Sequence, residues 1–243
     1  MKVSSRMCIL LTSLMMLGFS GTEAGGQDVQ KRVEEAGGII PLTGNRRERQ
    51  QWQEIVDLIR LEDEEGRPVH PTLKRLWEWL EGSGHTIYID MRKRRGAINV
   101  AGSFALRKFD PKGGRHVGVI RLNLSNIDQA IVADRNRLRN GLIPFEGLGR
   151  VERYAEVLGH EMSHAVHILS DHALGRSVID LVDRTNEMLL DRNRKRGLES
   201  IGTDFRARLS ERDELLRRLE SRAGDVEKIV WSELHQAHAR RER

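Results

Sequence analysis

The sequence predicts an α+β protein that is predominantly helical, with a small antiparallel sheet packed on a central helix over residues 151–170 and a helical hairpin or bundle over 174–243. Apolar residues recur at helical spacing over most of the chain, and three strand-like runs lie together between residues 85 and 124. Hydrophobic residues make up 38% of the 243 positions and charged residues 32%, which is typical of a globular protein and excludes wholesale disorder.

The first 24 residues, 1–24, have the layout of a secretory signal peptide. Lys2 and Arg6 form a basic start, a mostly apolar run follows, and small residues precede a cut after Ala24. The apolar run is shorter than the ~20 residues that a spanning helix needs, so we expect cleavage, with a retained anchor as the alternative. The mature protein is then secreted or periplasmic and has no stable membrane span. Because Cys8 is the only cysteine, a zinc site in the mature chain must use His, Asp or Glu.

The N-terminal part of the mature chain is expected to be a loose arm followed by helices. Residues 25–45 are rich in glycine and weakly patterned, whereas 46–243 has the pattern of a single domain. Its first helix is predicted within 46–65, where apolar residues recur at helical spacing. A second helix is predicted from Pro71 to near Gly82, because proline favours the first turn of a helix and glycine favours its end.

Three strand-like runs follow these helices, over 85–91, 98–106 and 116–124. They are rich in β-branched residues or alternate between apolar and polar positions, most cleanly in the third run, HVGVIRLNL. The segments between them, RKRRG and DPKGGR, are typical of turns, so the predicted sheet is small and antiparallel. A glycine-containing loop over 141–149 then leads into the central helix.

The chain after Asp171 is predicted to be almost entirely helical, over 176–194 and 204–240. In the second of these helices apolar residues recur every seven positions, which predicts a packing seam formed by Leu209, Leu216, Ala223, Val230 and Ala237. Gly224 and Asp225 could interrupt this helix, so the phase of the seam across them stays open.

The central helix carries the sequence GHEMSHAVH over residues 159–167. Residues four apart lie on one face of a helix, so His160 and His164 project side by side and can bind one zinc ion. Glu161 is rotated by about 100° from His160, so its carboxylate can reach a metal-bound water without being a ligand. Gly159 allows a close backbone approach just before the first histidine. The competing interpretation is a buried helix whose histidines have ordinary polar partners.

In these residues the chain resembles the zincin metallopeptidases, over roughly residues 85–170. The resemblance implies that His160 and His164 are zinc ligands, and that Glu161 is the general base that activates a zinc-bound water to attack a peptide carbonyl. It also implies that HVGVIRLNL, residues 116–124, is an edge strand along which an extended substrate can pair its backbone.

The motif does not fix the third ligand. The metzincin pattern HExxHxxGxxH fails, because His167 stands at its glycine position and Ser170 at its third histidine. The chain instead resembles the gluzincins, in which a glutamate from a later helix completes the site. We favour Glu220, because its ESRA run resembles the third-ligand run of gluzincin-like families and is followed by small residues. The alternatives that stay open are Glu233, Glu227 and Glu187, each of which is otherwise a solvated helix glutamate.

These features predict a secreted, zinc-dependent hydrolase, specifically a metallopeptidase that acts on a peptide or protein. The alternative is a catalytically inactive metal-binding or helical interaction protein on the same scaffold, which the long charged seam of the last helix favours. The net charge of +5 and several arginine clusters could favour nucleic acid. No aromatic residues interleave these clusters, however, and export separates the protein from most nucleic acid, so we expect no such partner.

Overall fold

The computed structural model describes residues 37–92, 100–110, 112, 114–140, 148–181 and 203–241. The predicted signal peptide over 1–24, most of the predicted arm and Glu187 lie outside these residues. The fold is α+β and predominantly helical, with one small sheet, as the sequence predicted. None of the helices within the described ranges is both long enough and apolar enough to cross a membrane.

The sheet has four strands in the order β1-β2-β4-β3, formed by β1 (Gly38–Leu42), β2 (Thr86–Asp90), β3 (Gly102–Lys108) and β4 (Val117–Leu122). It is mixed: β1–β2 and β2–β4 are parallel, and only β3–β4 is antiparallel. The prediction of an antiparallel sheet is therefore wrong for two of the three pairings. The physical reason is connectivity, because a crossover through two helices joins β1 to β2, whereas a short loop joins β3 to β4.

β1 lies within the segment that was predicted to be a loose arm, so that prediction is wrong for residues 38–42. The strand is short and contains Pro41, which an edge strand tolerates because one row of its backbone groups needs no partner. Gly37 precedes it with φ +73°, and a Cβ there would lie 3.0 Å from the carbonyl oxygen of Gly84. Gly37, one of the glycines that indicated a loose arm, thus allows the backbone to pass close to Gly84 just before β1 begins.

The edge strands are β1 and β3, whereas the run HVGVIRLNL contributes β4, which lies between β2 and β3. The implied edge-strand role of residues 116–124 is therefore corrected. β4 is largely buried, and the position of Gly118 is closely packed: a Cβ there would lie 2.6 Å from Phe104 and 3.1 Å from Ile87. The alternation of this strand thus reflects packing inside the sheet.

Two helices precede β2. α2 (Arg46–Ile59) begins at Asn45, whose side chain accepts a hydrogen bond from the backbone N–H of Glu48, and α3 (Pro71–Gly82) has proline in its first turn. α2 ends at Ile59, short of the predicted limit of residue 65. The chain turns beyond it around Asp63, whose carboxylate accepts hydrogen bonds from backbone N–H groups two and four residues later.

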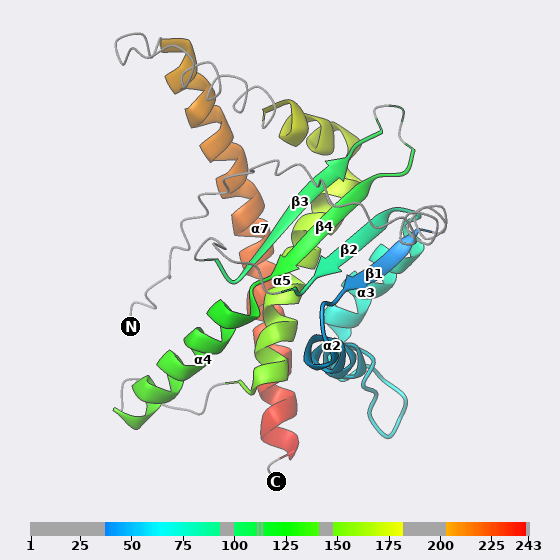
Figure 1. Cartoon of the computed structure of the whole chain (residues 1–243), viewed down its shortest axis with the longest axis vertical. Helices are drawn as coiled ribbons and strands as arrows, with labels where there is room; N and C mark the ends of the chain where they lie inside the picture. The colour runs from blue at the N-terminus through cyan, green and yellow to red at the C-terminus, as the bar shows by residue number, and fades with distance from the viewer. Residues whose placement is uncertain are drawn as a thin grey trace.

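The core lies around α5 (Arg150–Ser170), the predicted central helix (Figure 1). α3 and α5 pack against the sheet, and α2, α4 (Leu124–Arg139) and α7 (Thr203–Arg241) pack against α5. α7 continues through Gly224 and Asp225 without interruption. Its predicted seam is confirmed at Ala223, Val230 and Ala237, which are buried. The other arm of the predicted C-terminal hairpin lies beyond residue 181, outside the described residues.

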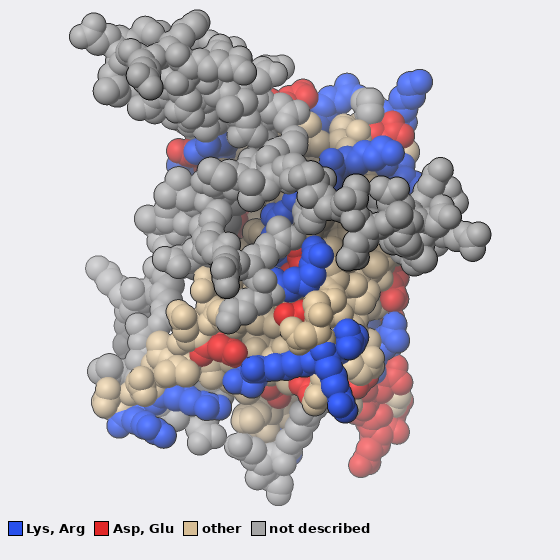
Figure 2. All heavy atoms as spheres, viewed as in Figure 1, with Lys and Arg blue, Asp and Glu red and all other residues tan. Residues whose placement is uncertain are grey.

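Many basic side chains at the surface are paired with acidic ones. On the face drawn in Figure 2, Lys and Arg lie in several separate groups with acidic side chains beside them. Among the described residues these ion pairs include Arg60–Glu81, Arg67–Asp63, Lys74–Glu62, Arg153–Asp134 and Lys228–Asp225. On the side shown, the Lys and Arg side chains are thus spread over several separate areas of the surface.

Candidate metal centre

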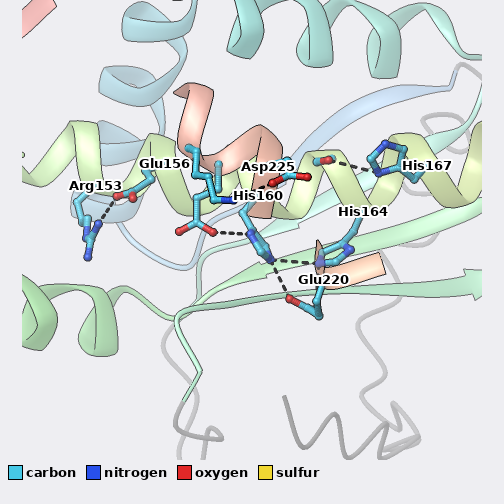
Figure 3. A network of polar contacts seen from close by, with 10 residues as sticks. Arg153, Glu156, His160, His164, His167, Glu220 and Asp225 are labelled. Atoms are coloured by element: carbon cyan, nitrogen blue, oxygen red, sulfur yellow. Dashed lines mark hydrogen bonds and ion pairs between the residues drawn. The ribbon is translucent and has the colours of Figure 1, made fainter. Parts of the chain in front are cut away.

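α5 presents the motif histidines because its opposite side is tied into the core. Its buried apolar residues recur at helical spacing, and they are Tyr154, Leu158, Met162, Ala165 and Leu169. His160 and His164, one turn apart, project from the helix toward α7, as Figure 3 shows. Their side chains are only 16% and 9% exposed. The predicted side-by-side placement of the two imidazoles is present in the structure.

Gly159 lets two other helices approach α5 beside this pair. A Cβ at this position would lie 2.8 Å from Cδ2 of Leu73 on α3 and 3.4 Å from Cγ2 of Val230 on α7. Ala223, also on α7, is fully buried. The close backbone approach expected at Gly159 thus brings α7 within side-chain reach of the histidines.

Glu220 of α7 meets both imidazoles. Nε2 of His160 lies 3.1 Å from Nε2 of His164 and 3.4 Å from Oε2 of Glu220, and Nε2 of His164 lies 3.2 Å from Oε1 of Glu220. Zinc bonds of ~2.0–2.1 Å at tetrahedral angles place neighbouring donor atoms about 3.3–3.4 Å apart. The two imidazole nitrogens are thus spaced nearly as two donors to one such ion, and each of them has a different oxygen of Glu220 at a similar distance.

No protein-family model, no curated protein and no solved structure matches this chain. The donor set itself is informative about the ion. His160, His164 and Glu220 form a group that could hold a metal ion, and two imidazole nitrogens with one carboxylate are donors that zinc accepts. The residues present thus fit zinc, with three protein donors of the four that a tetrahedral ion takes.

Charge is concentrated around these donors. Burial by itself lowers the pKa of His160, but hydrogen bonds to the carboxylates of Glu220 and Glu227 outweigh it and raise that pKa to about 10. Burial raises the pKa of Glu220, yet hydrogen bonds from His160 and His164 outweigh it and lower the pKa to about 2. The anionic carboxylates therefore attract a cation, and in the metal-free protein a proton on His160 fills this role.

Glu161 is buried beside the donor group and is not a member of it. Burial raises the pKa of Glu161 to about 7, against the opposing effect of His164 and His160. Its carboxylate lies against the edge strand: a Cβ on Gly102 of β3 would lie 2.7 Å from Oε1 of Glu161. A carboxyl whose pKa lies near neutrality can both accept and return a proton, as a general base must.

The remaining predicted candidates have other partners. Glu227 accepts a hydrogen bond at 2.8 Å from Nδ1 of His160, on the far side of the ring from Glu220. Both carboxylate oxygens of Glu233 accept from the backbone N–H of Thr72, and its Oε1 also accepts from the hydroxyl, at the start of α3. Among the described residues, the group that could hold a metal ion thus has Glu220 as its third member, and Glu227 and Glu233 lie outside it.

A charged network that was not predicted adjoins the site. The Arg153 guanidinium pairs with the buried carboxylate of Glu156 and lies 3.5 Å from Asp134. Arg153 and Glu156 stand three residues apart on one helix, so their pairing could have been predicted from spacing. His167, one turn beyond His164, instead lies 3.4 Å from the hydroxyl of Ser163 and takes no part in the group.

Proposed function

We propose that the protein is an exported zinc metallopeptidase in which His160, His164 and Glu220 hold the ion and Glu161 is the general base. The observation that carries this proposal is the convergence of Nε2 of His160, Nε2 of His164 and the Glu220 carboxylate, with contacts of 3.1–3.4 Å, in a group that could hold one metal ion. The export signal predicted over residues 1–24 places the activity outside the cytoplasm.

When bound, a zinc ion acidifies a coordinated water and polarises a carbonyl oxygen, which is the chemistry that amide hydrolysis needs. Glu161 takes the proton of the attacking water as the water oxygen bonds to the carbonyl carbon. It then returns that proton to the amide nitrogen, so that the C–N bond breaks to give a carboxylic acid and an amine. The pKa of Glu161, raised to about 7 by burial, suits both transfers near neutral pH.

Among the described strands β3 has a neighbour only on the β4 side, so its outer edge can give an extended peptide a place beside Glu161. Asn123 donates its backbone N–H to the carbonyl of Ala101, so this opposed pair is hydrogen-bonded. Hydrogen-bonded and non-hydrogen-bonded pairs alternate in an antiparallel ladder, so the backbone groups of Gly102 and Phe104 turn away from β4. They therefore offer a row of main-chain partners along the edge, starting at the residue that contacts Glu161.

Replacement of Glu161 by Gln tests the assignment. This change preserves the shape of the side chain but removes the base, so we expect zinc to stay at one ion per chain while cleavage of a denatured protein falls by ~10²–10⁴. Glu211→Gln, at an exposed position on α7, is the matched control and should cleave like the wild type. A Glu161→Gln protein that binds zinc and cleaves at the wild-type rate disproves the base assignment. A wild-type protein that retains only trace zinc disproves the metal site.

A metal-binding interaction protein without turnover is the second candidate. The observation that favours it is on α7, where Ile229 is 51% exposed and Trp231 is 38% exposed beside the charged outer face of the helix. Ile229 and Trp231 stand two residues apart and are rotated by about 200° from one another, so each offers a partner a single apolar contact on its own side of α7. Equimolar zinc together with no cleavage of any peptide in a diverse library would favour this candidate over the peptidase.

A further inference from the structure

The imidazole of His160 is held on both sides. Its Nε2 faces the Nε2 of His164 and a carboxylate oxygen of Glu220, and its Nδ1 lies 2.8 Å from Oε2 of Glu227. A ring that gives one nitrogen to a metal ion carries its proton on the other nitrogen and donates it to an acceptor. Glu227 is an acceptor in the position that this tautomer requires.

We propose that Glu227 is a positioning residue of the metal centre: it fixes the orientation and the Nδ1–H tautomer of His160 so that Nε2 is available to the ion. This inference rests on the proposed function, since it concerns the same metal ion. It also separates two glutamates that sequence reasoning treated as competing ligands. Glu220 is a donor to the metal, and Glu227 acts on the metal only through His160.

The spacing of the two glutamates on α7 explains how one helix supplies both. Glu220 and Glu227 are seven residues apart, so they lie on one face of α7 and about 10.5 Å apart along its axis. Glu220 thus meets the histidines at Nε2, and Glu227 reaches back from two turns further along to Nδ1 of His160. A glutamate one turn earlier or later would miss this nitrogen.

A cation on α5 holds the charge of Glu227 in place. Arg153 lies seven residues before His160, on the same face of α5, and its guanidinium interacts electrostatically with Glu227 as well as with Glu156 and Asp134. Glu227 thus interacts electrostatically with Arg153 and by a hydrogen bond with His160. Its charge favours both the proton on Nδ1 and the positive ion beyond the ring.

The experiment compares three full-length variants with the wild type. Glu227→Met has similar length but no acceptor, Glu227→Gln keeps a carbonyl acceptor without the charge, and Asp225→Asn is the control. Asp225 is 69% exposed on the same turn of α7 and pairs with Lys228, so its replacement makes the same charge change away from His160. Zinc affinity is measured by competition with a chelator, and the absorption spectrum is recorded with cobalt in place of zinc.

We expect Glu227→Met to weaken zinc binding by about 10–100-fold, with Glu227→Gln between it and the wild type. Asp225→Asn should stay within about twofold of the wild type. Because Glu227 is not a ligand, each variant should bind one cobalt ion with the wild-type band intensity. This partial rescue by Gln is not expected of a residue that only stabilises the fold.

Two results overturn the inference while the wild type binds zinc. If Glu227→Met binds zinc as tightly as Asp225→Asn, Glu227 is only a solvated glutamate. If it abolishes zinc binding and changes the cobalt spectrum, Glu227 is a ligand. Failure of the proposed function is recognised separately: a wild type that binds no zinc refutes the metal site, and a wild type that binds zinc without cleaving peptides refutes only the peptidase assignment. Circular dichroism of each metal-free variant confirms that the comparison is made on folded protein.

Discussion

Replacement of Gly102 by Ala tests the contact between the edge strand and the proposed base. An ideal Cβ at Gly102 would lie 2.7 Å from Oε1 of Glu161, 2.8 Å from its Cγ and 2.8 Å from Cγ1 of Val157. Ordinary contacts of a Cβ lie at 3.4–4 Å, so these groups must separate by roughly 0.6–0.7 Å. Val157 is β-branched on a helix and has one strongly preferred rotamer, so the displacement falls on Glu161 or on the strand.

The expected magnitudes follow from this crowding. Overpacking of a filled interior costs about 1–3 kcal/mol of unfolding free energy. A displacement of about 1 Å at a reacting group can cost ~10² in rate, so we expect peptide cleavage to fall by about tenfold or more. The three atoms nearest to the new methyl group belong to Glu161 and Val157 and not to His160, His164 or Glu220, so zinc affinity should stay within about twofold.

Three measurements on the same protein check this prediction: denaturant unfolding, zinc affinity and cleavage of a denatured protein. Gly82→Ala is the matched control, because a Cβ at this position in the last turn of α3 meets nothing within 4 Å. The reasoning is refuted if Gly102→Ala is as stable and as active as Gly82→Ala. Loss of zinc from Gly102→Ala would also refute it, since the crowding would then have reached the donors.

Two further predictions concern stability. Burial lowers the pKa of His85 and of His116, whose rings stack at 4.7 Å and whose Nδ1 atoms accept backbone N–H groups, so both are neutral in the folded protein. The unfolded chain binds protons at these residues below its ordinary pKa of 6.5, so their contribution to the unfolding free energy should be fully present above pH 6.5 and fall as pH drops below it. Urea unfolding of the wild type and of His116→Gln at about pH 7.5 and about pH 5.5 isolates this contribution, because the raised pKa values of His160 and Glu161, which act in the opposite direction, are common to both proteins. The wild type should lose stability relative to the variant at the lower pH, and an equal difference at both pH values would refute the reasoning. Glu233→Ala removes the acceptor of Thr72 at the start of α3 and should lower the unfolding free energy by about 1–2 kcal/mol. Its zinc affinity should stay within about twofold of the wild type, and a loss of zinc would instead make Glu233 part of the metal site.

The parts of the site that one helix contains were predictable from the sequence. His160, Glu161 and His164 lie within five residues, so their mutual placement depends only on the helical repeat. The apolar pattern around them predicts that helix by itself. Gly159 was also identified correctly, because a small residue next to a functional one indicates close packing of helices. Local periodicity thus fixes the motif before any tertiary contact is known.

The parts that failed depend on pairings between distant segments. The strand order β1-β2-β4-β3 puts β4 inside the sheet, and no periodicity within HVGVIRLNL distinguishes a central strand from an edge strand. β1 is five residues long and has neighbours that are rich in glycine, so its strand pattern is too short to recognise. Both errors arise because the position of a strand in a sheet is set by its partners.

Two properties of α7 decide which glutamate meets both imidazoles: which of its residues face α5, and where α7 is placed along its own axis relative to α5. Glu220 and Glu227 each follow directly after a packed residue of the helix, Leu219 and Val226, so both flank the seam on the side of the histidines. The side of the helix on which a residue lies therefore does not distinguish Glu220 from Glu227. The axial position of α7 distinguishes them, and the contact of Val230 with Gly159 sets that position.

The same register governs the packing of α7 and the metal centre. A shift of α7 by one turn, about 5.4 Å, would remove Val230 from Gly159 and Glu220 from both imidazoles at once. An ion bound by His160, His164 and Glu220 would join α5 to α7 at this register, so its binding free energy would also favour the docked position of α7. The seam and the three donors thus form one cooperative unit. The packing of α7 places Glu220 beside the histidines, and a bound metal ion would in turn stabilise that packing.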